Sequence, residues 1–130
     1  MNLLVSIAAG LAAVLHVFFF CMESLWWTKP AVYRRFRSNA ADAQTTKSLA
    51  LNQGFYNLFL AIGTFIGLGL MASGHRWTGV ILVGWNCASM LGAAIVLLVS
   101  SPRMARGALI QGLAPLVALI TLAMQYRNLL

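Results

Sequence analysis

Four long apolar stretches joined by short connections limit what this chain can fold into. They lie near residues 3–27, 47–73, 77–99 and 104–125. Each is long enough for the about 20 residues that an α-helix needs to cross a bilayer. With 61% hydrophobic and 8% charged residues, the chain differs sharply from soluble domains, in which about 25% of residues are charged. We therefore predict one membrane domain, residues 1–130, that folds as an all-α polytopic four-helix bundle.

The connections predict an antiparallel up-down topology with a defined orientation. Two connections, 74–76 and 100–103, are short enough to be tight turns between antiparallel neighbours. Most basic residues fall in the first and third connections, at Lys29, Arg34, Arg35, Arg37, Lys47, Arg103 and Arg106. Because basic loops stay cytoplasmic, both termini are expected on the non-cytoplasmic side. The net charge of +7 then reflects topology and contact with the lipid bilayer, and no nucleic-acid partner is predicted.

The first connection, residues 28–46, is the only long one. Pro30 can open a short helix, in which apolar residues alternate with arginines at Val32, Tyr33 and Phe36. This pattern favours an interfacial helix on anionic lipid, and a gate over a cytoplasmic cavity is the alternative. Ser38 or Asn39 is expected to cap a second helix that runs through Asp42 into the membrane.

Polar side chains inside the apolar stretches mark the candidate site. They are His16, Glu23, Asn52, Gln53, Asn57, Asn86 and Gln111. Counted from the helix ends at about 1.5 Å per residue, all lie at the midplane or in the cytoplasmic half. Ionisable groups at such depth cost about 2.5–3.5 kcal/mol and usually mark a functional site. We predict that these residues, with Tyr56, line a cytoplasm-facing polar cavity that binds a ligand.

Helical register supports this clustering. His16 and Glu23 are seven residues apart and would share one face of an α-helix. Tyr56 follows Asn52 by four residues, as Asn57 follows Gln53. The structural alternative is that these groups only make hydrogen bonds between helices, each worth about 0.6 kcal/mol.

Small residues recur at the spacing of close helix contacts. Gly63 and Gly67 form a GxxxG motif, and Gly84, Ala88 and Gly92 repeat every four residues. These faces could pack inside the bundle or between protomers. A homo-oligomer is expected because four helices alone enclose little cavity.

No metal or cofactor is predicted. The sequence has no HExxH, no CxxC, no phosphate-binding glycine loop and no acidic cluster. Cys21 and Cys87 are isolated in apolar stretches, where they are expected to be packing residues. A haem with His16 as axial ligand is an alternative.

Several segments resemble one protein family. The run from His16 to Pro30 (HVFFFCMESLWWTKP), Phe36, the block NQGFYN at residues 52–57, and Gln111–Gly112 with Pro115 are similar to the domain-of-unknown-function family numbered 1304. The resemblance implies a small four-helix integral membrane protein of bacteria, placed in the plasma (inner) membrane as a multi-pass protein. It implies no assigned activity.

Three functional interpretations follow. The first is binding or transport of a small molecule at the polar site, with Glu23 as the titrating group of a proton-coupled carrier. The second is an acid–base enzyme, an isomerase or ring-opening hydrolase, that acts on a lipophilic substrate through His16, Glu23, Tyr56 and Asn57. The third is a structural membrane scaffold. The first is preferred, and the sequence leaves open whether the protein is an enzyme.

Overall fold

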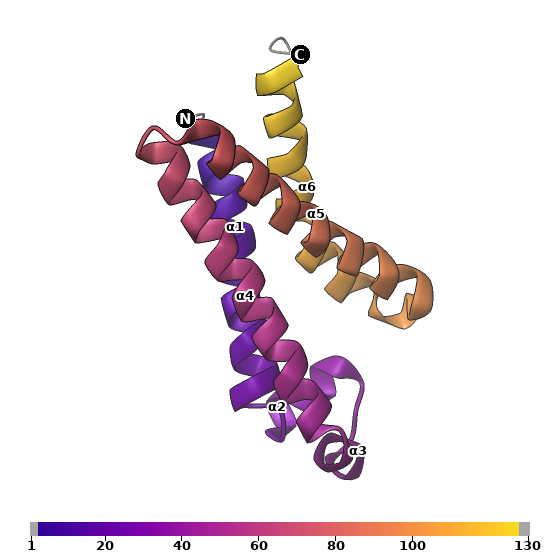
Figure 1. Cartoon of the computed structure of the whole chain (residues 1–130). Coiled ribbons are helices and arrows are strands. Elements are labelled where there is room, and N and C mark those ends of the chain that lie inside the picture. The colour runs from indigo at the N-terminus through magenta and orange to yellow at the C-terminus, as the bar shows by residue number, and fades with distance from the viewer. Residues whose placement is uncertain (1–2, 128–130) are drawn as a thin grey trace.

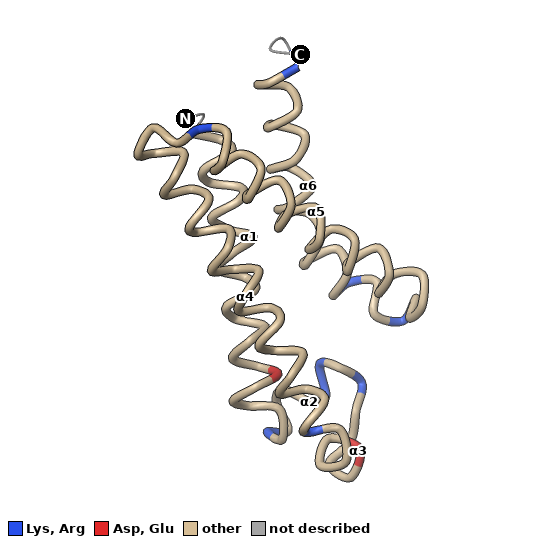
Figure 2. Tube along the Cα trace, in the orientation of Figure 1, with Lys and Arg blue, Asp and Glu red and all other residues tan. Residues whose placement is uncertain are grey.

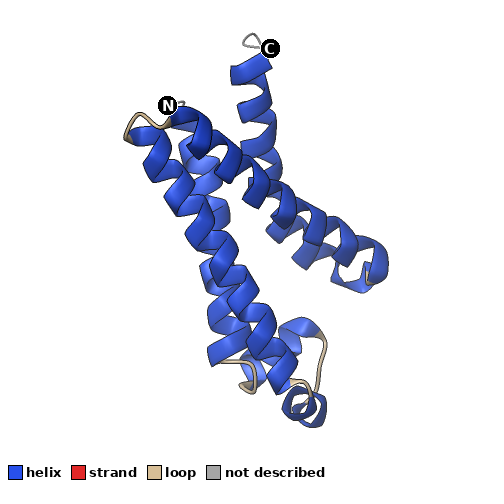
Figure 3. Ribbon diagram, in the orientation of Figure 1, coloured by secondary structure: helices blue, strands red, loops and turns tan. Residues whose placement is uncertain are grey.

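The computed structural model describes residues 3–127, and throughout this range the ordered elements are helices (Figure 3). The four long helices are α1 (Leu3–Phe20), α4 (Lys47–Ala72), α5 (Arg76–Ser100) and α6 (Ala105–Tyr126). A π-helical turn, Cys21–Leu25, extends α1, and a short 3-10 turn, Pro102–Met104, precedes α6. All four are long and apolar enough to cross a membrane. The predicted all-α bundle of four apolar helices is confirmed.

The helices pack in a ring, and the ring opens toward one end. Both α1 and α5 contact α4, and both also contact α6. Near the turn between α4 and α5 the helices lie close together (Figure 1). Toward the other end, the α1–α4 pair diverges from the α5–α6 pair (Figure 1). The first connection lies at this open end, where its helix α3 (Ala40–Thr45) contacts α4.

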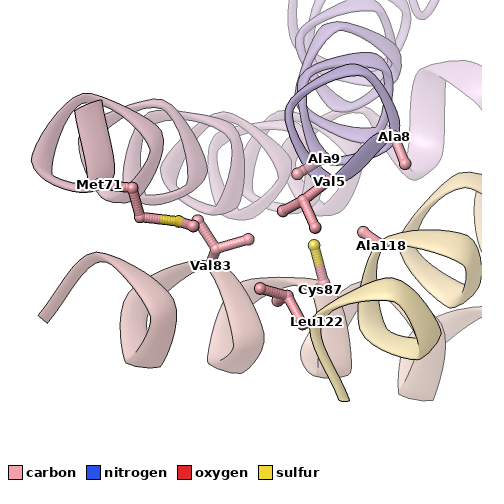
Figure 4. Close-up of a cluster of buried hydrophobic side chains, with 8 residues drawn as sticks. All are labelled: Val5, Ala8, Ala9, Met71, Val83, Cys87, Ala118 and Leu122. Atoms are coloured by element: carbon pink, nitrogen blue, oxygen red, sulfur yellow. The ribbon is translucent and has the colours of Figure 1, made fainter. Parts of the chain in front are cut away.

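Small and medium-sized side chains fill the core. One buried cluster consists of Val5, Ala8, Ala9, Met71, Val83, Cys87, Ala118 and Leu122 (Figure 4). Cys87 is fully buried there and acts as a packing residue. Large apolar residues lie on the outside instead, as Trp85 does with 72% of its surface exposed. Apolar residues on the outer faces and alanines at the contacts suit a lipid environment, where small residues let helices approach.

Contacts between α4 and α5 depend on glycine. A Cβ atom added at Gly67 would lie 2.8 Å from Val83 Cγ2 and 3.1 Å from the Gly79 carbonyl oxygen. A Cβ at Gly63 would lie 2.7 Å from Asn86 Nδ2. The GxxxG motif thus packs inside the bundle. Gly84 and Gly92 have open space around them, so the small-residue face of α5 is turned outward.

Two short helices form the first connection. Pro30 occupies the first turn of α2 (Pro30–Tyr33), where its missing N–H costs nothing. A 3-10 turn (Arg34–Phe36) follows, and Arg37 then reverses the chain with a positive φ of 54°. Val32 and Tyr33 of α2 are buried, whereas the arginines that follow this helix are exposed.

The helix that follows ends before the long apolar helix α4 begins. Asn39 caps α3 (Ala40–Thr45), its Oδ1 accepting a 2.9 Å hydrogen bond from the Asp42 backbone N–H. The prediction of this cap is confirmed, but the prediction that the helix continues into the membrane is wrong. The chain leaves helical geometry at Thr46, whose φ and ψ are −93° and 4°. Its hydroxyl donates to the Asp42 carbonyl oxygen at 2.7 Å, and α4 begins anew at Lys47.

Basic residues are concentrated at the open end. Figure 2 places most Lys and Arg in the first connection and at the turn between α5 and α6. One lies near the start of α5 and one at the end of α6. α1 begins and α6 ends at the opposite end from the basic connection (Figure 1).

Substitution of two glycines in α4 tests the close contact with α5. Gly67→Ala should lower the free energy of unfolding by about 1–3 kcal/mol, because the new methyl group meets Val83. Gly69→Ala is the matched control, since nothing lies within 4 Å of its added Cβ. It should stabilise by about 0.5–1 kcal/mol through helix propensity. Unfolding in detergent measures both, and equal stabilities would contradict this packing.

Candidate functional site

A π-helical turn at the end of α1 positions the only acidic residue of the apolar helices. The Trp26 backbone N–H donates to the Cys21 carbonyl at 3.0 Å, across five residues. Such a turn is wider than an α-helical turn and is frequent at functional sites. The expectation that His16 and Glu23 share one face rested on an unbroken α-helix, and the π-helical turn interrupts the α-helix between these two residues.

Contact with α4 anchors this wide turn. Ser24 Oγ donates a 2.9 Å hydrogen bond to the Leu51 carbonyl oxygen of α4. Gly54 lies directly opposite, and a Cβ atom there would collide with Ser24 Oγ. Glycine at this position lets the π-helical turn rest on the α4 backbone. Phe20 and Phe55 pack edge to face beside it, with ring centroids 5.2 Å apart.

The central interaction of the site joins Glu23 to α4. Asn57 Nδ2 donates to Glu23 Oε2 at 2.6 Å. Asn57 is 8% exposed, and Glu23 is half-buried. A single side-chain hydrogen bond thus links residues 34 positions apart in the sequence and leaves Glu23 Oε1 available to another group.

A pocket of about 510 Å³ opens beside this pair. Glu23 lines it together with the side-chain amides Asn52 and Gln53. Hydroxyl groups and aromatic rings complete the wall, at Ser38, Thr46, Trp27 and Phe36. The volume lies in the range of small-molecule sites. The arrangement can hold a small polar or charged molecule through one carboxylate and several neutral groups.

The first connection forms one wall of the pocket. The Trp27 and Phe36 rings lie with centroids 5.0 Å apart and planes inclined by 60°. Trp27 Nε1 also donates to Thr46 Oγ1 at 3.2 Å, which ties the start of the connection to its end. Aromatic residues at and within the connection thus line the pocket, in addition to any role of this segment at the bilayer interface.

His16 lies apart from the pocket and is fully buried. Its Nδ1 is 2.8 Å from the Ala12 carbonyl oxygen. Because a carbonyl oxygen only accepts, Nδ1 carries the hydrogen in this arrangement. Nε2 has no hydrogen-bond partner among residues 3–127.

The remaining predicted residues do not line the pocket. Asn86 is buried, but its Nδ2 donates to the Leu82 carbonyl oxygen of its own helix at 2.8 Å. Tyr56 is 57% exposed, and Gln111 is half-buried on α6. The structure therefore brings together four predicted residues, Glu23, Asn52, Gln53 and Asn57.

Sequence reasoning missed the hydroxyl and aromatic members of the pocket. Trp27 and Phe36 fit equally well as residues of the bilayer interface, and Thr46 fits a helix cap. Their only common signal was position, since Trp27 directly precedes the first connection and the others lie within it. Among residues 3–127, no group of three or more His, Cys, Asp or Glu side chains could hold a metal ion.

Comparison with known protein families matches residues 10–123 to the family described as protein of unknown function (DUF1304). The chain belongs to this family. Comparisons with curated proteins and with solved structures give no match. The match spans the π-helical turn, the first connection and all of α4, so the whole pocket lies within the family region.

A double-mutant cycle tests the bond between Glu23 and Asn57. Asn57→Leu should destabilise by about 0.6–1.7 kcal/mol, the usual range for hydrogen bonds between membrane helices. Combined with Glu23→Leu, the loss should be smaller than the sum of the two single losses. Unfolding in detergent gives each free energy. Asn86→Leu is the control, because its partner lies in its own helix and its effect should add to that of Glu23→Leu. Additive losses at Glu23 and Asn57 would contradict the interaction.

Proposed function

We propose that this protein is an integral membrane protein that binds a small molecule in the pocket beside Glu23 and Asn57. The observation that carries the proposal is the placement of Glu23. It is half-buried in a membrane-spanning helix, has one oxygen held by Asn57, and lines a pocket with two further amides. Ionisable residues at such positions usually mark a binding or transport path.

The basic residues support an orientation for this pocket. The pocket lies at the end of α1 that carries the first connection, where four basic residues precede Lys47. By the positive-inside rule this end is cytoplasmic, and both termini lie on the other side. A pocket open to the cytoplasm in a multi-pass protein of the plasma membrane suits uptake, release or sensing of a cytoplasmic molecule.

Binding or transport is favoured over acid–base catalysis by the position of His16. An acid–base pair must reach the same substrate within hydrogen-bond distance. His16 is enclosed and does not line the pocket, whereas Glu23 does.

The outward small-residue face of α5, at Gly84 and Gly92, supports a homo-oligomer in which a second copy packs on this helix.

Native mass spectrometry of protein extracted from its host membrane tests the binding proposal. The wild-type protein should carry a small molecule that Gln53→Leu removes or reduces at least tenfold, because Gln53 lines the pocket. Gln125→Leu is the matched control, since it makes the same change near the far end of α6. Retention in both variants, or loss in both, would contradict a site at this pocket.

Cysteine labelling in intact cells tests the orientation. In a background without Cys21 and Cys87, Ser73→Cys should react with a membrane-impermeant maleimide, because Ser73 lies at the non-cytoplasmic end. Thr28→Cys, at the start of the first connection, should react only after the cells are lysed. The reverse pattern would overturn the orientation.

A further inference from the structure

We propose that the pocket beside Glu23 accepts an organic cation, a protonated or quaternary amine with a compact apolar body. This inference rests on the binding function proposed above and names its ligand class. Three observations carry it. Among residues 3–127, the pocket wall contains a carboxylate with only one of its oxygens hydrogen-bonded and two aromatic rings inclined to each other, and no Lys or Arg side chain lines the pocket.

A positively charged partner would stabilise the half-buried carboxylate of Glu23. Asn57, a neutral amide, donates to Oε2, and the second oxygen of this half-buried, pocket-lining carboxylate is left for another partner. A buried charge is costly unless it is paired and hydrogen-bonded. Although the chain has nine Lys and Arg residues and two acidic ones, none of the described residues that line this pocket is Lys or Arg.

The basic residues that neighbour the lining residues in the sequence do not line this pocket themselves, and two of them, Arg35 and Arg37, are exposed. Lys47 lines a separate pocket of about 360 Å³ together with Ser24. Lys29 places its Nζ 5.6 Å from the centre of the Trp26 ring, which does not line the Glu23 pocket. The start of α4 contributes at most about half a positive charge, which one ionised carboxylate outweighs. The pocket therefore favours a cation over an anion.

The aromatic wall suits the same ligand class. Trp27 and Phe36 both line the pocket, and their planes are inclined by 60°. The indole N–H is held by Thr46, which fixes the ring orientation. Aromatic faces attract cations and repel anions, and Trp is the most effective ring for this purpose. Leu49 and Ala50 add apolar surface, which fits the carbon substituents of an amine.

Calorimetric titration of the full-length protein in nanodiscs of zwitterionic lipid tests the proposal. Three probes of similar shape are compared: benzyltrimethylammonium, the uncharged neopentylbenzene, and the anion phenylacetate. The cation should bind at least tenfold more tightly than the other two. Glu23→Gln should weaken cation binding at least tenfold, and Trp27→Leu should weaken it by about three- to thirty-fold.

Asp42→Asn provides the matched control. It removes the only other acidic residue, which is exposed on α3 and does not line the pocket, so cation affinity should be unchanged. If Glu23→Gln fails to fold, as judged by size-exclusion chromatography, Trp27→Leu and Glu23→Asp still test the pocket.

The other outcomes separate the ligand class from the binding function. If phenylacetate or neopentylbenzene binds as tightly as the cation, or if Asp42→Asn weakens binding as much as Glu23→Gln, the cation proposal is wrong. If no probe binds but a molecule that depends on Gln53 copurifies with the protein, the ligand class is wrong and the binding function stands. If no probe binds and no such molecule copurifies, both proposals fail.

Discussion

Close approach of helix backbones at glycine controls this structure. Helices in lipid gain little from burying apolar surface, so they associate through tight packing and hydrogen bonds. Gly67 lets α5 pack on α4, and Gly54 lets the π-helical turn after α1 pack on the same helix. With both contacts in place, α4 holds its two neighbours at defined distances. The bond from Asn57 to Glu23 depends on the second of these contacts.

The divergence of the two helix pairs determines what kind of site can form. Where α1 and α4 separate from α5 and α6 (Figure 1), the bundle core no longer encloses polar groups from all four helices. The pocket is built instead from one helix pair and the connection that joins it. This explains why Glu23, Asn52 and Gln53 line one pocket, while the Asn86 side chain donates to the Leu82 carbonyl oxygen of its own helix.

Much of the fold follows from the sequence, because hydropathy and local signals specify it. The apolar stretches, Pro30 at the start of α2 and the Asn39 cap of α3 are all properties of short segments. The π-helical turn is different, since it depends on a contact between Ser24 and α4 that no local pattern encodes. Depth in the membrane placed Glu23 and Asn57 in the same half of the bundle, but it was the structure that joined them by a hydrogen bond. Depth alone could not show that the Asn86 side chain makes its hydrogen bond within its own helix, or that Trp27 lines the pocket.

The fit of Ser24 against Gly54 has a consequence for how the family can vary. The hydroxyl of Ser24 occupies the space that any side chain at position 54 would need. A related chain with alanine at position 54 would need a smaller side chain at position 24, or it would lose the wide turn. The two positions are thus expected to change together in related sequences. Such covariation would identify the family members in which the π-helical turn holds the carboxylate of residue 23 beside α4.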